Sequence, residues 1–337
     1  MFIFKRQDFY KRNRKNSIVN TKNKNAVIWY AKDAFDPSEI LNGRRVAGVS
    51  FLKGYFDHAE AGKFVSLVDG RGGAEEFKAI AKQHGVTRPV RSVFRSETAK
   101  ISPLDSIFIS TPNFHQQLWQ RSHFGHNSYS VCGLTHTIST AAVMEGMYHM
   151  RHAPQQEWDG IICTSPAVRS SLQYMFDRVD SYLLDRFGKV PPRPQLPVIP
   201  LGVNTQDFAA DPQLRAALRS ENGWGEDDVV FLTVARLAPH VKFDPIPFFI
   251  ALEAAQNQLG DKKKLHFVAF GIYADQHSEK VFIDAARKIL KSVSFHHFDE
   301  SQKQTVRKCL SGADVFAFPI DNLQESFWPC TCRGHEC

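Results

Sequence analysis

The stretches VVFLTVAR (229–236) and LHFVAFG (265–271) decide the fold of this chain. Each is an uninterrupted apolar run of strand length, the pattern of a strand that is buried on both faces of a parallel sheet. A helical pattern starts near residue 247 between them, and further strands are expected at VSFHHF (293–298) and DVFAFPI (314–320). Strands that alternate with helices in this way predict an open α/β sheet with crossover helices.

The same alternation fills the first half of the chain. Buried strands are expected at four apolar runs, which are AVIWYA (26–31), SIFIST (106–111), YSVCGL (129–134) and GIICTS (160–165). Helical patterns cover 74–83 and 166–187, and a proline-rich stretch at 189–208 separates this half from the next. Because 337 residues exceed the size at which one core usually stops growing, two domains are expected.

The pattern divides the chain into five segments. They are a basic leader at 1–24, a first Rossmann-like domain at 25–202, a linker region at 203–226, a second domain at 227–327 and a tail at 328–337. Two doubly wound domains that face one another bind ligands in the cleft between the carboxyl ends of their strands. The polar residues that directly follow each strand are therefore the candidates for function.

The positive charge of the chain is confined to its start. The formal net charge is +7, and residues 1–24 hold eight Lys or Arg against Asp8 alone. The other residues carry 34 basic and 34 acidic side chains, so the body of the protein is neutral. A neutral body argues against nucleic acid as a partner. The leader is expected to be disordered or, alternatively, to make peripheral contact with anionic lipid.

The apolar runs of the chain are too short to cross a membrane, because a spanning helix needs about twenty apolar residues. The start also lacks the apolar core of a secretory signal. We therefore expect a cytoplasmic protein, whose only membrane contact is peripheral and at the inner face. Cys132, Cys163 and Cys309 lie in apolar surroundings and are expected to be buried free thiols.

Three charged residues follow expected strands of the second domain. Arg236 ends VVFLTVAR, Lys242 comes six residues later, and Glu325 follows DVFAFPI. A forked guanidinium and an ammonium group can neutralise the charge of a departing diphosphate. A carboxylate beside a helix start can orient sugar hydroxyls. Taken singly, each residue also fits a plainer role, as a surface-loop cation or a helix N-terminal charge.

Five motifs of the second half resemble, in order and spacing, the donor half of glycosyltransferase family 4, retaining enzymes of the GT-B fold. They are VIPLGVNTQDF, VARLAPHVK, LHFVAFG, VSFHHF and GADVFAFPIDNLQESF, and the resemblance covers about residues 198–327. It implies two Rossmann-like doubly wound domains, a UDP- or GDP-sugar as donor and a glycan or lipid as acceptor. It also implies that Arg236 and Lys242 bind the diphosphate and Glu325 the sugar, with no cofactor and no metal.

Two other classes of enzyme and a metal site are less consistent with the sequence. The absence of any Asp-x-Asp disfavours a metal-dependent GT-A enzyme, and the absence of G-x-G-x-x-G after a strand weakens a dehydrogenase reading. His296 and His297 are adjacent in a strand, so their side chains are expected on opposite faces and not on one metal. A non-catalytic nucleotide-sugar-binding or regulatory protein of the same fold remains the alternative to an enzyme.

The first half offers two further candidates. His136 follows YSVCGL, where members of the family often carry a histidine near the transferred sugar, and a structural histidine is the alternative. Gly48, in NGRRVAGVSF, would let a helix start approach the diphosphate through bare backbone, and a turn glycine is the alternative.

The tail crowds Cys330, Cys332, His335 and Cys337 together. These residue types can bind zinc, but the cysteine spacing is short and a second pair of ligands is missing. The family pattern requires a glutamate eight positions after Glu325, where this chain has Arg333. One permitted codon set, with one base removed, reads Phe-Gly-Pro-Ala-Pro-Val-Glu-Ala-Met-Ser and places a glutamate at position 333. We therefore interpret the tail as out of frame, the second domain as truncated and the chain as inactive.

Overall fold

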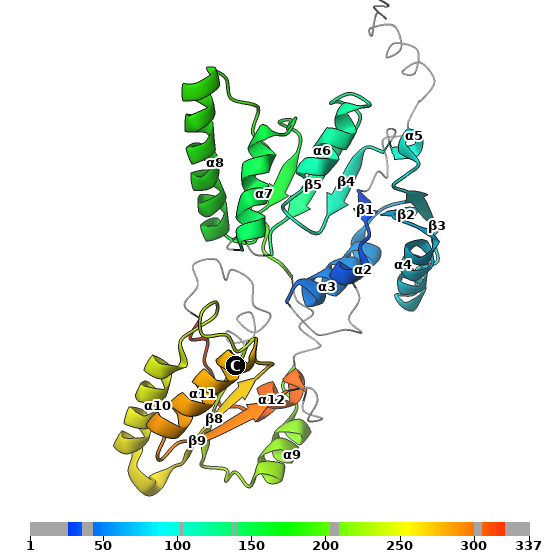
Figure 1. Cartoon of the computed structure of the whole chain (residues 1–337). Coiled ribbons are helices and arrows are strands. Elements are labelled where there is room, and N and C mark those ends of the chain that lie inside the picture. Colours follow the sequence, from blue (N-terminus) through cyan, green and yellow to red (C-terminus); the bar gives the residue numbers. More distant parts are fainter. Residues whose placement is uncertain are drawn as a thin grey trace, which may run out of the picture.

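The computed structural model describes residues 26–35, 43–101, 104–136, 138, 140–202, 209–299 and 305–320. These residues form two parallel sheets, each in its own α/β unit (Figure 1). The first sheet has the order β3-β2-β1-β4-β5-β6. Its strands are β1 (Val27–Trp29), β2 (Phe64–Val68), β3 (Val90–Phe94), β4 (Ser106–Ile109), β5 (Ser130–Leu134) and β6 (Gly160–Ile162). This is the strand order of a doubly wound Rossmann sheet.

Helices cover both faces of the first sheet, with one apolar core on each side. One core receives side chains from α2 (Lys32–Phe35), α3 (Gly43–His58) and α4 (Arg71–Gln83). The other receives them from α5 (Thr98–Ile101), α6 (His115–Ser122), α7 (Ala141–His152) and α8 (Pro166–Phe187). Neighbouring residues of β1 serve opposite cores, since Ile28 joins the first and Val27 the second. The strands are therefore buried on both faces, which explains their continuous apolar runs.

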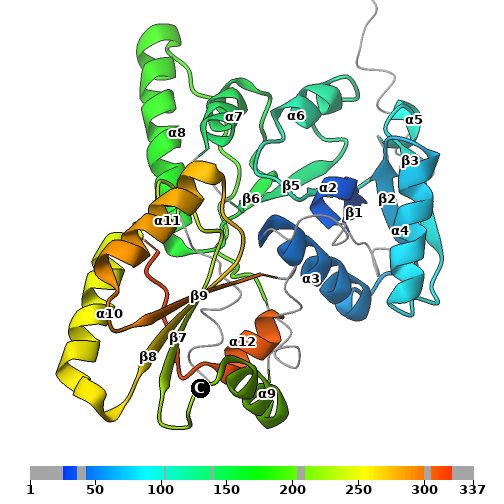
Figure 2. The same cartoon turned by 60° about the horizontal axis from the view of Figure 1, so that its bottom comes forward.

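The second sheet has the order β10-β7-β8-β9, again with all strands parallel. Its strands are β7 (Val229–Val234), β8 (Leu265–Phe270), β9 (Ser294–Phe298) and β10 (Val315–Phe316). The helices α10 (Pro245–Leu259) and α11 (Gln276–Ile289) pack on one face, and a short 3-10 helix, η2 (Gly260–Lys262), follows α10. The helices α9 (Pro212–Asn222) and α12 (Val306–Gly312) pack on the other (Figure 2).

The expected strands and helices are largely confirmed. The helix expected at 166–187 is α8, with the same bounds. It is capped by Ser165, whose side chain accepts a hydrogen bond from the Val168 N–H, and ends at Gly188 with φ 67°. Strand β10 is shorter than the expected 314–320, and the expected linker 203–226 contains α9, which packs on α12.

Buried ion pairs support the helices of the first unit. The two terminal guanidinium nitrogens of Arg121, on α6, donate to the two carboxylate oxygens of Asp159, at 2.5 and 2.7 Å. Both side chains are 0% exposed. The Asp159 carboxylate also accepts hydrogen bonds from the backbone N–H groups of Val131 and Gln156. This network ties α6 to β5 and to the segment that leads into β6.

The proline-rich segment 190–200 follows α8 and runs along the outer edge of β6. Gly160 pairs with Gln195, and Cys163 with Val198, in parallel register. The guanidinium of Arg151, which is fully buried, donates to the carbonyl oxygens of Pro191 and Pro192, both at 2.9 Å. The segment thus closes the β6 edge of the first sheet before the chain continues to the second unit.

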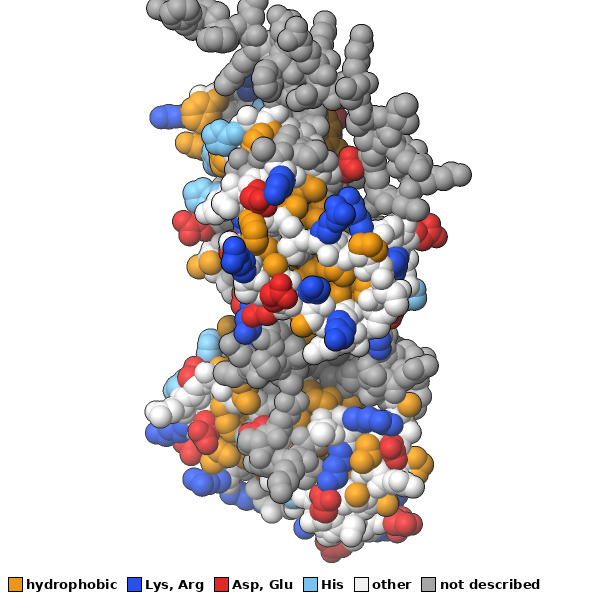
Figure 3. Space-filling model, turned by 90° about the vertical axis from the view of Figure 1, so that its right-hand side faces the viewer, with side chains coloured by type: hydrophobic (Ala, Val, Ile, Leu, Met, Phe, Trp, Pro, Cys, Tyr) orange, Lys and Arg blue, Asp and Glu red, His pale blue; other side chains and the backbone are white. Residues whose placement is uncertain are grey.

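The surface carries charges of both signs. On the face shown in Figure 3, Lys and Arg side chains are interspersed with Asp, Glu and hydrophobic side chains. Within the described ranges, no helix is long and apolar enough to cross a membrane. The three cysteines expected as free thiols are free, with Cys163 and Cys309 buried and Cys132 half-buried.

Candidate functional site

The second sheet has its topological switch point between β7 and β10. The chain leaves β7 and β8 toward the face covered by α10 and α11, whereas it enters β10 from α12 on the opposite face. Ligands of open α/β sheets bind outside the carboxyl ends of the strands at such a point. Arg236 lies two residues beyond the end of β7 and is exposed. The structure thus places this sequence-predicted cation beside the switch point.

The loop that carries Arg236 is anchored on both sides. Leu237 and Ala238 are completely buried, and Phe243 is 1% exposed. Lys242 lies in the same loop, is half-buried, and donates its backbone N–H to the Ala238 carbonyl at 2.9 Å. The loop therefore has a fixed backbone from which the two candidate cations extend.

The loop after β8 packs directly against the backbone that precedes Arg236. Gly271 has φ 141°, in a region that L side chains rarely adopt. A Cβ at this position would lie 2.9 Å from the carbonyl carbon of Ala235 and nearer still to its oxygen. Only glycine fits this contact. The sequence signal for this contact is the glycine that ends the apolar run LHFVAFG, although the sequence does not indicate which backbone it approaches.

The adjacent histidines of β9 turn to opposite faces, as predicted. The His297 Nε2–H donates to the Gly271 carbonyl at 2.7 Å, and the His297 ring lies 4.4 Å from the Tyr273 ring. His296 instead lies 3.3 Å from the His266 Nδ1 and packs on Trp224. Burial lowers the pKa of His296 to about 4, and the nearby His266 and Lys264 add to that effect.

Glu325 and the cysteine-rich tail lie outside the described residues, so their predicted roles stay predictions. In the described ranges, no group of three or more His, Cys, Asp or Glu side chains is arranged to hold a metal ion. Arg215 and Arg219 of α9 pair with Asp314, at 2.6 and 3.1 Å, at the amino edge of the second sheet, which is opposite to the carboxyl ends of its strands. Their pairing with Asp314 ties α9 to the start of β10.

The candidates of the first unit lie in different settings. His136 follows β5 by two residues, at the carboxyl edge of the first sheet, and is half-buried. Gly48 lies inside α3 rather than at a helix start. A Cβ on Gly48 would lie 3.1 Å from the Ala34 carbonyl carbon and nearer to its oxygen, so the close approach of α2 and α3 accounts for this glycine. The structure does not bring Gly48 to the end of a strand.

A second charged group at the carboxyl edge of the first sheet was not singled out from the sequence. The Arg95 guanidinium lies 4.0 Å from the Trp29 ring centre and donates to the Tyr30 carbonyl at 2.8 Å. It also pairs with Asp69 at 2.6 Å. Burial lowers the pKa of Arg95, and the Asp69 charge opposes that shift. Asp69 and Arg95 each directly follow a strand, β2 and β3, which was the available signal.

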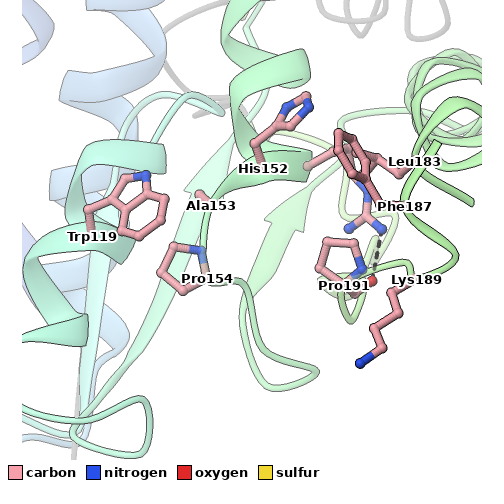
Figure 4. Close-up of a pocket in the computed structure, with 9 residues that line it drawn as sticks. Trp119, His152, Ala153, Pro154, Leu183, Phe187, Lys189 and Pro191 are labelled. Carbon is pink, nitrogen blue, oxygen red and sulfur yellow. Dashed lines mark hydrogen bonds between the residues drawn. The ribbon is translucent and has the colours of Figure 1, made fainter.

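A hollow of about 430 Å³ lies elsewhere, at the C-terminal ends of α6, α7 and α8 (Figure 4). Trp119, Pro154, Phe187 and Pro191 give it an apolar lining, and Lys189 lies at its margin. Because these helices run back from the carboxyl edge, their C-terminal ends lie at the amino edge of the sheet. The hollow is therefore remote from the carboxyl ends of the strands.

Comparisons with known proteins address the fold. Neither the protein-family models nor the curated proteins gave a match to this chain. Among solved structures, HepE of Anabaena in complex with UDP-glucose is similar, with a TM-score of 0.51 and 14% identity over 87% of this chain and 73% of that chain. The N-terminal domain of Candida albicans trehalose-6-phosphate phosphatase is also similar, with a TM-score of 0.52 and 12% identity over 90% and 77%. Identities this low support a statement about the fold alone. The structural similarity and the two strand orders together show that this chain has the GT-B fold of two Rossmann-like domains.

Proposed function

We propose that the protein is a glycosyltransferase of the family 4 type that takes its sugar from a nucleoside diphosphate sugar. The observation that carries the proposal is the exposed Arg236 at the carboxyl end of β7, on a loop fixed by Leu237 and Phe243 at the switch point of the second sheet. Lys242 supplies a second cation from the same loop. The bound UDP-glucose of the similar HepE structure supports this class of donor.

The chemistry requires charge stabilisation more than a covalent catalyst. When the bond between the sugar C1 and the diphosphate oxygen breaks, negative charge develops on the departing diphosphate. Arg236 and Lys242 are proposed to stabilise that charge. The acceptor hydroxyl then forms its bond to C1 on the face that the diphosphate leaves, which retains the anomeric configuration, and its proton passes to the departing phosphate oxygen.

The donor is a UDP- or GDP-sugar, the acceptor is a glycan or a lipid, and the reaction needs no metal. Glu325 is assigned to the sugar hydroxyls and His136 to the region near the transferred sugar. The protein is proposed to be cytoplasmic, with peripheral contact at the inner membrane face. Such a location would give it access to a lipid acceptor.

Donor binding is the direct test of this proposal. Calorimetry with UDP and GDP on the full chain is expected to show binding of one of them. Arg236→Ala should weaken that binding by about 10-fold or more, since hydrogen bonds to charged groups are worth about 1.5–3 kcal/mol. Lys242→Ala should act in the same direction. Lys288→Ala, which removes an exposed lysine on α11, is the matched control and should leave the affinity unchanged.

Turnover separates the enzyme from the non-catalytic alternative. Because the tail is interpreted as out of frame, turnover is measured on a chain whose tail is restored to the frame that places a glutamate at position 333. In that frame-restored chain, Arg236→Ala should lower turnover by about 10²-fold, the cost of removing one charge-stabilising group. Proton NMR of the product reports whether the anomeric configuration is retained. Binding of a nucleoside diphosphate without transfer or hydrolysis of any donor, even by the frame-restored chain, would favour a binding or regulatory protein. If neither UDP nor GDP binds, the proposal is excluded.

A further inference from the structure

The loops that follow β7 and β8 are joined through their backbones on both sides of Arg236. The Ala235 N–H donates to the Phe270 carbonyl at 3.0 Å, and the Leu237 N–H donates to the Ile272 carbonyl at 2.9 Å. The Ala274 N–H returns a bond to the Leu237 carbonyl at 3.1 Å. The backbone position of Arg236 is therefore set by the loop 271–274.

That loop is in turn held by β9 at Gly271 and Tyr273. The Gly271 N–H donates to the Phe298 carbonyl at 2.8 Å. Its carbonyl accepts the His297 Nε2–H at 2.7 Å. The ring of His297 also packs against Tyr273, at 4.4 Å between ring centres. His297 therefore contacts the loop at two of its four residues.

The contact between Gly271 and Ala235 transmits the position of one loop to the other. Because there is no space for a Cβ between Gly271 and the Ala235 carbonyl, a shift of Gly271 must move the backbone that precedes Arg236. Packed interiors transmit such displacements because they hold few voids that could absorb them. The neighbouring His296 points to the other face of the sheet and contacts neither loop.

We propose that His297 is a positioning residue for Arg236, and so for the diphosphate of the donor. This inference rests on the proposed function, because the group that Arg236 is to meet is the diphosphate. His297 does not touch the ligand in this arrangement. It acts through the Gly271 carbonyl, the loop 271–274 and the backbone of Ala235 and Leu237.

Two polar substitutions of His297 test whether its hydrogen bond to the Gly271 carbonyl, and not merely the presence of its ring, positions the loop. The amide nitrogen of glutamine can take the place of Nε2, whereas that of the shorter asparagine takes the place of Nδ1 and does not reach the Gly271 carbonyl. His297→Asn should weaken UDP binding by about 3- to 10-fold, the effect of one hydrogen bond. His297→Gln should bind UDP within about twofold of the unchanged protein. His296→Gln is the matched control at the next position and should leave UDP affinity unchanged.

The decisive experiment is a double-mutant cycle on the full chain, with UDP binding measured by calorimetry. Arg236→Lys keeps a cation, so binding stays measurable, but it loses the planar fork. If His297 acts through Arg236, His297→Asn should cost less than about twofold in the Arg236→Lys background. Equal losses in both backgrounds, or no loss with His297→Asn alone, would overturn the inference while leaving the proposed function intact. A protein that binds no UDP or GDP at all would overturn both.

Discussion

The contact between Gly271 and Ala235 gives a sharp prediction for Gly271→Ala. Two costs add at this position. The backbone at φ 141° is unfavourable for alanine, which costs about 1–3 kcal/mol. The new Cβ would also lie 2.9 Å from the Ala235 carbonyl carbon. Because the neighbouring atoms belong to the backbone, no side-chain rotation can relieve this clash. Overpacking of this kind costs about 1–3 kcal/mol more. We expect a total loss of about 2–6 kcal/mol in the free energy of unfolding.

Gly85→Ala is the matched control for this substitution. Gly85 has φ 70° but no atom within 4 Å of the position its Cβ would take, so it carries the backbone cost without the contact. That cost is about 1–2 kcal/mol. Urea denaturation followed by circular dichroism measures both variants. If Gly271→Ala costs no more than Gly85→Ala, the two loops are not in the close contact described here. Gly271→Ala should also weaken UDP binding, since it displaces the backbone before Arg236.

Two further predictions concern stability. Arg121→Met leaves the carboxylate of Asp159 buried without its cation and should cost about 3–5 kcal/mol in urea denaturation, whereas Lys308→Met, which breaks a partly exposed pair, should cost about 0.2–1 kcal/mol. A loss below 1 kcal/mol for Arg121→Met would contradict the first. His296 is held neutral, with its pKa lowered from 6.5 to about 4, so the unfolded chain binds a proton that the folded chain does not. The contribution of His296 is present above pH 6.5 and is lost as the pH falls from there toward 4, at up to about 1.4 kcal/mol per pH unit. His296→Gln should flatten this slope, and an unchanged slope would show that other groups cause it.

The fold was largely predictable because its strands are buried on both faces. VVFLTV and LHFVAF are continuous apolar runs, so they read as strands without any knowledge of their neighbours. The limits of α8 were also predictable, since Ser165 and Pro166 mark its start and Gly188 its end. Two strands of the first sheet, β2 and β3, were not predicted. The edge strand β3 has a partly exposed sequence, VRSVF, without a continuous apolar run. The run FVSLV of β2 is interrupted by Ser66, whose buried hydroxyl is bonded to that of Ser92 on β3.

The candidate site was predictable only in part, for a physical reason. Arg236 follows a recognisable strand, and the carboxyl ends of parallel strands are where ligands bind. The approach of Gly271 to Ala235 and the hydrogen bond from His297 to Gly271 join residues that are remote in sequence. Such pairs depend on the register of β7, β8 and β9, which a single sequence does not specify. For Gly48, the sequence suggested a helix start, whereas the structure places it inside α3 against the Ala34 carbonyl, a contact that also depends on tertiary packing.

The proline-rich segment along β6 has a consequence for how this protein avoids self-association. An open sheet edge offers unpaired N–H and C=O groups to strands of other molecules and so promotes aggregation. Here the edge beyond β6 is formed by a segment whose backbone at Gln195, Pro197 and Ile199 bonds to β6 and its flanking residues. The outer border is therefore formed by the alternate residues, of which Pro194 and Pro200 have no N–H to donate. A strand from another molecule would find few donors along this border. The segment that carries the chain from one sheet to the other therefore also protects the first sheet from templated strand addition.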